Sequence, residues 1–196
     1  MNTYIYKLKN AIYINLSNRC TNDCSFCVRN NHDGVGGYHL LMDKEPSTEQ
    51  IISLLEKEED VSRIVFCGLG EPTTAIDVLI PVAQYLKKRG AQIRLNTNGQ
   101  GSAYAGRDIA KELSGLVDTV SISLNAPDAK EYQKICKSMY GERAFAHMLA
   151  FAQSCIANGI DTVLSVVDVI GPDNVAACSA IAKKTGARFR VRTYVE

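Results

Sequence analysis

Three cysteines lie close together near the beginning of the chain. Cys20, Cys24 and Cys27 form the pattern C-x3-C-x2-C. Cysteine thiolates bind iron-sulfur clusters, and a 4Fe-4S cluster normally takes four of them, so three cysteines leave one iron open to another ligand. The alternative is a zinc site made by the same cysteines and a histidine such as His32, because structural zinc takes four Cys or His ligands.

Four further cysteines are scattered along the chain: Cys67, Cys136, Cys155 and Cys178. An odd total of seven cysteines favours metal ligands and reduced core thiols over a disulfide framework. Free cysteine is among the most buried residue types, so we expect these four to pack inside strands and helices. They lie too far apart in the sequence to form a second compact ligand set, and no auxiliary cluster is expected.

The elements that position the cysteines alternate regularly. Short β-type runs are followed by helical patterns along the whole sequence, which is typical of βα units around a parallel sheet. Six strands are predicted at residues 11–16, 63–67, 92–96, 117–124, 162–167 and 188–194. Helices are expected at residues 48–57, 76–89, 106–114, 128–139, 143–158 and 174–185. Ser47 and Gln50 form a capping box that begins the first helix.

Polar and apolar residues alternate along the predicted strands. In the fourth strand Thr119, Ser121 and Ser123 alternate with Val120 and Ile122, and successive side chains of a strand point to opposite faces. The interior of a closed eight-stranded barrel is packed with apolar side chains. A polar inner face therefore indicates an α/β fold of another kind, an open partial (β/α)6 TIM-type barrel with parallel strands that holds a polar ligand.

Several motifs resemble those of a known family. The cysteine pattern with Phe26 before its last cysteine, placed after the first strand, resembles the signature of the radical S-adenosylmethionine (SAM) superfamily. Phe-Cys-Gly-Leu-Gly-Glu-Pro at 66–72 resembles its Gly-Gly-Glu-type motif, and Asn-Thr-Asn-Gly at 96–99 resembles its Thr-Asn-Gly turn. With Ser-Ile-Ser-Leu-Asn-Ala at 121–126, the chain is similar to the branch described as TatD-associated radical SAM proteins.

This resemblance implies two cofactors and a set of residues that hold them. Cys20, Cys24 and Cys27 are the expected ligands of the 4Fe-4S cluster, and the fourth iron is expected to bind SAM. The expected cofactor-binding residues are Phe26, Gly68, Gly70, Glu71, Asn96, Asn98, Ser123, Asn125 and Arg192. Among these, Arg192 suits a carboxylate because of its forked guanidinium, either that of SAM or that of an anionic substrate. The alternative is that the arginines of the last strand only protect a sheet edge from aggregation.

The resemblance also implies an activity. A radical SAM enzyme cleaves SAM reductively to a 5'-deoxyadenosyl radical, which abstracts hydrogen from a substrate, and we expect no catalytic residues beyond the cofactor ligands. Modification of a peptide or protein and modification of a nucleotide or RNA both remain open. The expected electron donor is a flavodoxin or a ferredoxin. The alternative function is a non-catalytic zinc- or cluster-binding interaction module.

Length and composition set the remaining expectations. The 196 residues, 46% hydrophobic with a net charge of +1, favour a single core domain over residues 1–196. No apolar run approaches the roughly 20 residues that span a bilayer, and no secretion signal is recognisable, so a cytoplasmic location without a membrane partner is expected. The near-neutral charge does not indicate nucleic acid. The loop at 28–46 is long enough to be a lid or binding loop.

Overall fold

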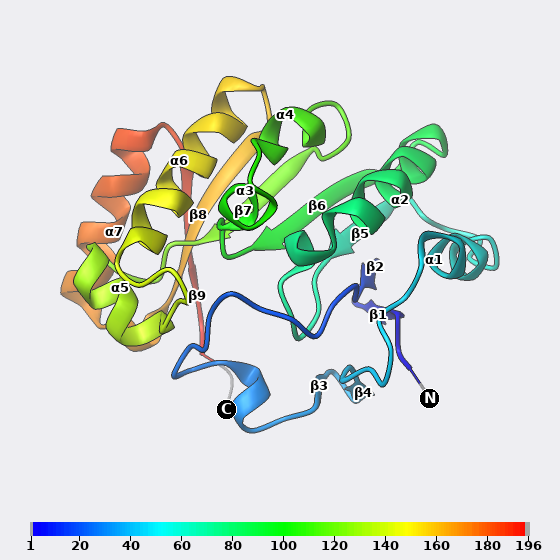
Figure 1. The fold of residues 1–196 in the computed structure, drawn as a ribbon, viewed down its shortest axis with the longest axis horizontal. Coiled ribbons are helices and arrows are strands. Elements are labelled where there is room, and N and C mark those ends of the chain that lie inside the picture. The colour runs from blue at the N-terminus through cyan, green and yellow to red at the C-terminus, as the bar shows by residue number, and fades with distance from the viewer. Residues whose placement is uncertain (1, 195–196) are drawn as a thin grey trace.

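A curved, mainly parallel sheet with helices on its outer face forms the frame of the computed structural model, which describes residues 2–194 (Figure 1). The strand order is β1-β2-β5-β6-β7-β8-β9, and the sheet does not close. The strands are β1 (Ile5–Leu8), β2 (Ala11–Ile14), β5 (Arg63–Phe66), β6 (Gln92–Thr97), β7 (Thr119–Ser123), β8 (Asp161–Val167) and β9 (Arg188–Arg192). The predicted open partial barrel with six parallel strands is confirmed.

One strand of the sheet, β1, was not predicted from the sequence. β1 pairs antiparallel with β2, with Ile5 opposite Ile14, and the two strands are joined by a tight turn in which Lys9 has a φ of 55°. This strand covers the edge that β2 would otherwise expose. A separate short hairpin, β3 (Gly34–Val35) and β4 (Tyr38–His39), lies within the predicted long loop.

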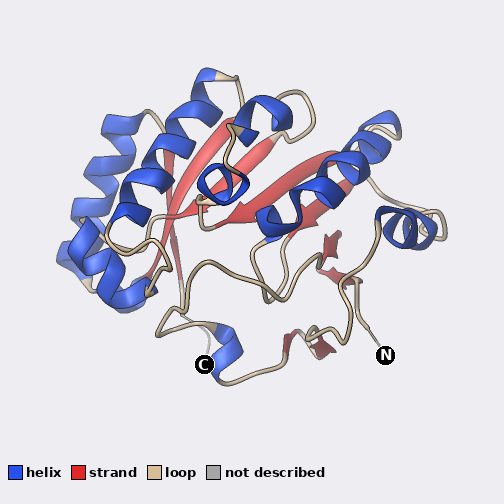
Figure 2. Cartoon of the chain, in the orientation of Figure 1, coloured by secondary structure: helices blue, strands red, loops and turns tan. Residues whose placement is uncertain are grey.

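The helices follow the predicted order along the outer face of the sheet (Figure 2). They are α1 (Thr48–Leu55), α2 (Ile76–Lys88), α3 (Gly101–Ala105), α4 (Ile109–Leu113), α5 (Ala129–Cys136), α6 (Arg143–Ala157) and α7 (Pro172–Thr185), with 3-10 turns η1 (Val28–Asn30), η2 (Pro72–Ala75) and η3 (Asp168–Ile170). The capping box is confirmed, because the Gln50 N–H donates to Ser47 Oγ and the Ser47 N–H to Gln50 Oε1.

One predicted helix had the wrong bounds. The pattern placed a helix at 106–114, but Gly106 has a φ of 67° and ends α3 in the left-handed conformation. A new helix, α4, begins after Asp108, whose carboxylate accepts a hydrogen bond from the Ala110 N–H. Glycine adopts this conformation readily, so here it stops a helix rather than starting one.

The hydrophobic core lies between the sheet and its helices. Ile14, Leu95, Ile122 and Leu164 are completely buried there, and burying each such side chain contributes about 1.5–3 kcal/mol. The alternate residues of the same strands lie on the inner face, as predicted. Val191 is an exception, since it has the core parity but is 46% exposed on the edge strand β9. No helix within residues 2–194 is long and apolar enough to cross a membrane.

Candidate cofactor site

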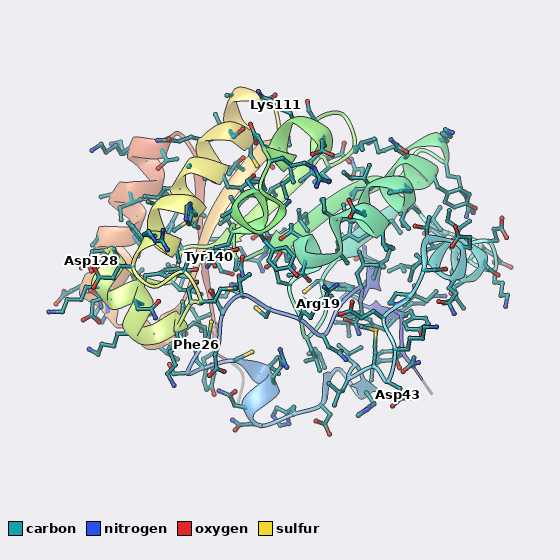
Figure 3. The ribbon with its side chains drawn as sticks, in the orientation of Figure 1. Arg19, Phe26, Asp43, Lys111, Asp128 and Tyr140 are labelled. Carbon is teal, nitrogen blue, oxygen red and sulfur yellow. The ribbon has the colours of Figure 1, made fainter. Side chains whose placement is uncertain are left out.

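The cysteine loop follows β2 and lies on the open side of the curved sheet. Figure 3 shows Arg19 and Phe26 on this segment, far from Lys111 on the outer helix α4. Cys20 is exposed, and Cys24 and Cys27 are half-buried. A tight turn joins the last two, since the Cys27 N–H donates to the Cys24 carbonyl over 3.1 Å. The thiols are thus presented by loop backbone at the carboxyl end of the first parallel strand.

Polar side chains from the end of β6 hold the first half of this loop. Asn98 Nδ2 donates to Thr21 Oγ1 over 2.8 Å, and Gln100 Nε2 donates to Asn22 Oδ1 over 2.8 Å. The buried hydroxyl of Tyr132 accepts from both Gln100 and Asn22. Buried hydrogen-bond networks of this kind fix a single geometry when all members are paired.

The second half of the loop rests on the end of α5. The Asp23 and Ser25 N–H groups donate to the carbonyls of Cys136 and Ile135, each over 3.0 Å. This contact brings Cys24 against Cys136, and the hydrogen bond between their thiols, together with burial, raises the pKa of Cys24. Cys136 is buried as expected, but it lies beside an expected cluster ligand. The spacing of the cysteines in the sequence gives no signal for this contact.

The environment of the cysteines favours the protonated thiols. Although Cys20 as a residue is exposed, desolvation of its thiol within the loop, followed by the nearby Glu71 carboxylate, raises the pKa of Cys20 to about 12. Burial also raises the pKa of Cys27. A metal bound by these thiols would have to displace their protons, which is the usual cost of thiolate coordination.

Glu71 is buried at the carboxyl end of β5, beside the cysteine loop. Its Oε1 accepts hydrogen bonds from Thr73 and Thr97, and its Oε2 accepts from the Asn98 N–H over 2.7 Å. Its own N–H donates to the Arg19 carbonyl. Burial raises the pKa of Glu71, and these donors act against that shift. The carboxylate therefore joins η2 to the end of β6, and the backbone N–H of Glu71 adds a contact with the cysteine loop.

Gly68 and Gly70 let β5 run close to the segment that follows β2. A Cβ added at Gly68 would lie 1.9 Å from Asn15 Oδ1, and one at Gly70 would lie 2.1 Å from the Ser17 carbonyl oxygen. Neither distance is possible for real atoms. The resemblance implies that both glycines bind a cofactor, and the structure gives them a packing reason.

Ser123 and Arg192 come together at the carboxyl ends of β7 and β9, and Asn125 lies two residues after Ser123. Arg192 Nη2 donates to Ser123 Oγ over 3.3 Å. Within residues 2–194, Asn125 Oδ1 and Arg192 Nε are buried without a hydrogen-bond partner, which is uncommon for buried polar atoms. Asn125 also has a φ of 53°. Asn15 Oδ1, next to Gly68, is a third such atom. The two at the strand ends leave hydrogen-bonding capacity for a polar ligand.

Asn96 and Phe26, two expected cofactor-binding residues, lie on different elements, a strand and the cysteine loop. Asn96 lies half-buried on the inner face of β6, where its Oδ1 accepts a hydrogen bond from Arg94 Nε over 2.9 Å. Phe26 is half-buried on the cysteine loop.

The location of Cys67 differs from the expectation that it packs in the core. It lies half-buried on the inner face, near Asn96, Arg94 and Glu71.

The second part of the loop at 28–46 is held against the segment after β2 by hydrogen bonds. Asn15 Nδ2 donates to the Leu40 carbonyl over 2.7 Å, Asn18 pairs with the backbone of Met42, and Glu45 accepts from Ser17 Oγ. His32 and His39, the loop histidines, are exposed. The loop therefore holds the residues that immediately precede the cysteines.

Two hollows lie elsewhere, at the amino-terminal edge of the strands. They measure about 490 and 260 Å³. The larger is lined by charged side chains that include Lys9 and Glu59, and the smaller reaches Arg94 on the inner face. Neither is lined by a residue of the cysteine loop.

A family model decides where this chain belongs. The model described as the Radical SAM superfamily matches residues 14–183. The chain belongs to the radical SAM superfamily. Its members are enzymes that bind a 4Fe-4S cluster and SAM. No curated protein sequence matches the chain, and the resemblance to the TatD-associated branch stays a prediction.

Solved radical SAM structures share this fold. SuiB of Streptococcus suis bound to the precursor peptide SuiA has a TM-score of 0.71 at 16% identity, over 94% of this chain and 39% of SuiB. The protein anSMEcpe with bound AdoMet has a TM-score of 0.65 at 19% identity, over 94% and 51%. A radical SAM methyltransferase from Sphaerobacter thermophilus has a TM-score of 0.61 at 14% identity, over 96% and 68%. The chain spans about two fifths of SuiB and half of anSMEcpe.

The residues at the site fit both radical SAM cofactors. Within residues 2–194, no three His, Cys, Asp or Glu side chains converge as the ligands of a single metal ion do. A cluster does not require such convergence, because each thiolate binds a different iron. The orphaned Asn125 Oδ1 and Arg192 Nε, on the strand ends beside Ser123, supply free hydrogen-bonding capacity for SAM.

Proposed function

We propose that this chain holds a 4Fe-4S cluster with Cys20, Cys24 and Cys27 and uses it to cleave SAM reductively. The observation that carries the proposal is the double attachment of the cysteine loop, to Asn98 and Gln100 on one side and to the end of α5 on the other. Held by these thiolates, a cluster would pass one electron from an external reductant to SAM, whose C5'–S bond would break to give methionine and a 5'-deoxyadenosyl radical able to take hydrogen from a substrate.

The residues of this chain have three tasks in that reaction. The network around Asn98, Gln100 and Tyr132 holds the cysteine loop rigid, so that the thiols keep one spacing. Ser123, Asn125 and Arg192 orient SAM from the strand ends, a role supported by the hydrogen bond between Arg192 and Ser123 and by the unpaired atoms of Asn125 and Arg192. Phe26, Gly68, Gly70, Glu71, Asn96 and Asn98 complete the SAM-binding set that we propose.

The site also gives reasons to prefer an enzyme over a zinc-binding interaction module. Zinc needs four ligands around one point, and His32 is exposed on a loop that is fastened elsewhere. In contrast, three cysteines and the unpaired polar atoms of Asn125 and Arg192, at the ends of β7 and β9, suit a cluster with a second ligand. We propose a flavodoxin or ferredoxin as the electron donor.

Anaerobic reconstitution with iron and sulfide tests the cluster. We expect about four irons per chain and a broad absorption shoulder in the visible range, and stoichiometric zinc without iron would support the interaction module instead. Incubation with dithionite and SAM then tests cleavage, with 5'-deoxyadenosine and methionine as products. The Cys24→Ala variant serves as the control and should form neither the cluster nor the products.

The substrate class follows from a labelling experiment. Peptide or protein modification is one candidate, since the solved structure of SuiB contains a precursor peptide; nucleotide or RNA modification is the other. Deuterium transferred from labelled candidates into 5'-deoxyadenosine identifies the substrate from which hydrogen is taken. Deuterium-free product with every peptide and protein tested, and labelled product with a nucleotide, would exclude the first candidate.

A further inference from the structure

Cys136, the last residue of α5, lies against Cys24 of the cysteine loop. Cys24 stands between Asp23 and Ser25, whose N–H groups donate to the carbonyls of Cys136 and Ile135, each over 3.0 Å. The last carbonyls of a helix have no partner within the helix, and here the loop supplies it. Backbone hydrogen bonds on both sides of Cys24 therefore fasten it to the end of α5.

The side chains of the two cysteines meet as well. Cys136 is part of the hydrophobic core, and Cys24 is the cysteine of the loop that packs against this core. Their thiols form a hydrogen bond. Cys136 is completely buried, whereas Cys24 is half-buried. A reagent from solution therefore reaches the thiol of Cys24 first.

This contact meets the conditions for a disulfide. The bond needs facing side chains on Cα atoms about 4.4–6.8 Å apart. Segments joined directly by N–H to carbonyl hydrogen bonds approach one another about this closely, and the thiols of Cys24 and Cys136 already touch. The bond can therefore form with the backbone hydrogen bonds of the loop in place.

From this arrangement we propose that Cys24 and Cys136 form a reversible disulfide when no cluster is bound, with a low-molecular-weight disulfide such as oxidised glutathione as the oxidant. The thiolate of Cys24 attacks one sulfur of the oxidant, whose S–S bond breaks to release one thiol. The thiolate of Cys136 then attacks the sulfur of Cys24, and the second thiol leaves. The two cysteines lose two protons and two electrons in total, and the oxidant takes them up as two thiols.

The disulfide competes with the cluster for Cys24. A sulfur bonded to Cys136 is not available to iron as a thiolate, so the oxidised chain cannot load the cluster until a reductant opens the bond. Transient disulfides of this kind occur in chains that otherwise keep their cysteines reduced. The inference rests on the proposed function, because it takes Cys24 as a ligand of the cluster.

Peptide mapping of the full chain, before reconstitution, tests the bond. The chain is incubated without air in a buffer of reduced and oxidised glutathione, its free thiols are alkylated, and fragmentation of its peptides in a mass spectrometer assigns each cysteine. We expect Cys24 joined to Cys136, and both free after treatment with dithiothreitol. Free thiols at both positions, or Cys24 joined to Cys20 or Cys27 instead, would overturn the proposal.

Two variants show whether Cys136 is the partner that makes the bond stable. In the same buffer Cys136→Ala should lower the oxidised fraction of Cys24 roughly tenfold or more, because a tethered thiol has a high effective concentration. Cys155→Ala is the matched control, since Cys155 is equally buried, on α6, and it should leave that fraction unchanged. Equal oxidation of Cys24 in the two variants would contradict the assignment. If Cys136→Ala does not fold, the mapping of the unchanged chain decides.

The same mapping separates this inference from the proposed function. The reconstituted chain, freed of excess iron and exposed to the same buffer, should show no bond between Cys24 and Cys136, and an equal yield of the bond would overturn the competition with the cluster. A bond in the empty chain, with no cluster in the reduced one, would overturn only the proposed function. Cluster loading and SAM cleavage without the bond in the empty chain would overturn only the disulfide.

Discussion

The side-chain amide of Asn98 donates a hydrogen bond of 2.8 Å to the hydroxyl of Thr21, the residue that follows Cys20. The same amide nitrogen lies 3.8 Å from Cys20 Sγ, and the Asn98 Oδ1 accepts from the Gln100 N–H. A residue that the family resemblance assigns to SAM thus also holds the backbone next to Cys20, a proposed cluster ligand. The cofactor site and the end of β6 are one structural unit.

Replacing Asn98 by Ala should therefore loosen the cysteine loop. The buried partners Thr21 and Gln100 each lose a hydrogen bond, at a cost of about 1–3 kcal/mol. We expect a lower melting temperature and incomplete iron loading on reconstitution. Asn174→Ala, which removes a single bond to the Ile170 carbonyl before α7, is the control and should load iron fully. Equal iron content in the two variants would contradict the positioning role.

Replacing the three cysteines one at a time tests directly whether they are the ligands of the cluster. Alanine at Cys20, Cys24 or Cys27 should abolish cluster retention and SAM cleavage, since each thiolate holds one iron. Cys178→Ala is the control, because Cys178 is buried on the distant helix α7. Iron content and 5'-deoxyadenosine formation are the measurements. Full iron in any of the three variants would mean that another residue, with Cys136 beside Cys24 the first to examine, replaces the missing ligand.

The positions of residues were predictable from the sequence where a local pattern encodes them. The cysteines were expected on a loop after the first parallel strand, and Ser123 and Ile122 on opposite faces of β7, and the structure places them there. The contact between Cys24 and Cys136 depends on how α5 packs against the loop, and no local pattern encodes it. The inner-face location of Cys67 was missed because a buried thiol in a strand has no preferred face in sequence.

In the fold, too, features encoded by local patterns were predicted and features that depend on packing were not. Six parallel strands follow from repeated βα patterns, whereas β1 is only four residues long and its pairing depends on the turn at Lys9. The helix expected at 106–114 was misplaced because glycine is compatible with either end of a helix. Long-range pairing and the choice between helix start and helix end are decided by tertiary contacts, which the pattern of a single segment does not contain.

Glu71→Gln should damage the fold as well as SAM binding. A carboxylate accepts hydrogen bonds on both oxygens, but an amide presents an NH2 group to one set of donors, either Thr73 with Thr97 or the Asn98 N–H. We expect a loss of about 1–3 kcal/mol of stability and a lower affinity for SAM. Glu49→Gln, on the exposed start of α1, is the control. Normal melting combined with lost SAM affinity would show that Glu71 acts only on the cofactor.

Gly70→Ala should displace the beginning of the cysteine loop. The added Cβ would meet the carbonyl oxygens of Ser17 and Arg19, at 2.1 and 2.7 Å, and backbone atoms cannot move aside as a side chain can. Gly141→Ala is the control, because its Cβ has open space and only the positive φ of 61° opposes it, at a cost of about 1–2 kcal/mol. Iron content should fall in the first variant and stay complete in the second. Equal iron content would remove the link between Gly70 and the loop.

Neighbouring residues of β7 provide a test of the two strand faces. Ser123 lies on the inner face and accepts a hydrogen bond from Arg192, whereas Ile122 is completely buried in the core. Ser123→Ala should weaken SAM binding roughly two- to tenfold, the effect of one neutral hydrogen bond, and leave the melting temperature nearly unchanged. Ile122→Ala should instead lower stability by about 2–5 kcal/mol through the cavity it leaves, with normal SAM affinity in the folded protein. Calorimetric SAM titration and melting curves on both variants measure the contrast. An early-melting serine variant with normal SAM affinity, or an isoleucine variant that melts normally and loses SAM, would place the cofactor on the helix-covered side of the sheet and contradict the proposed site.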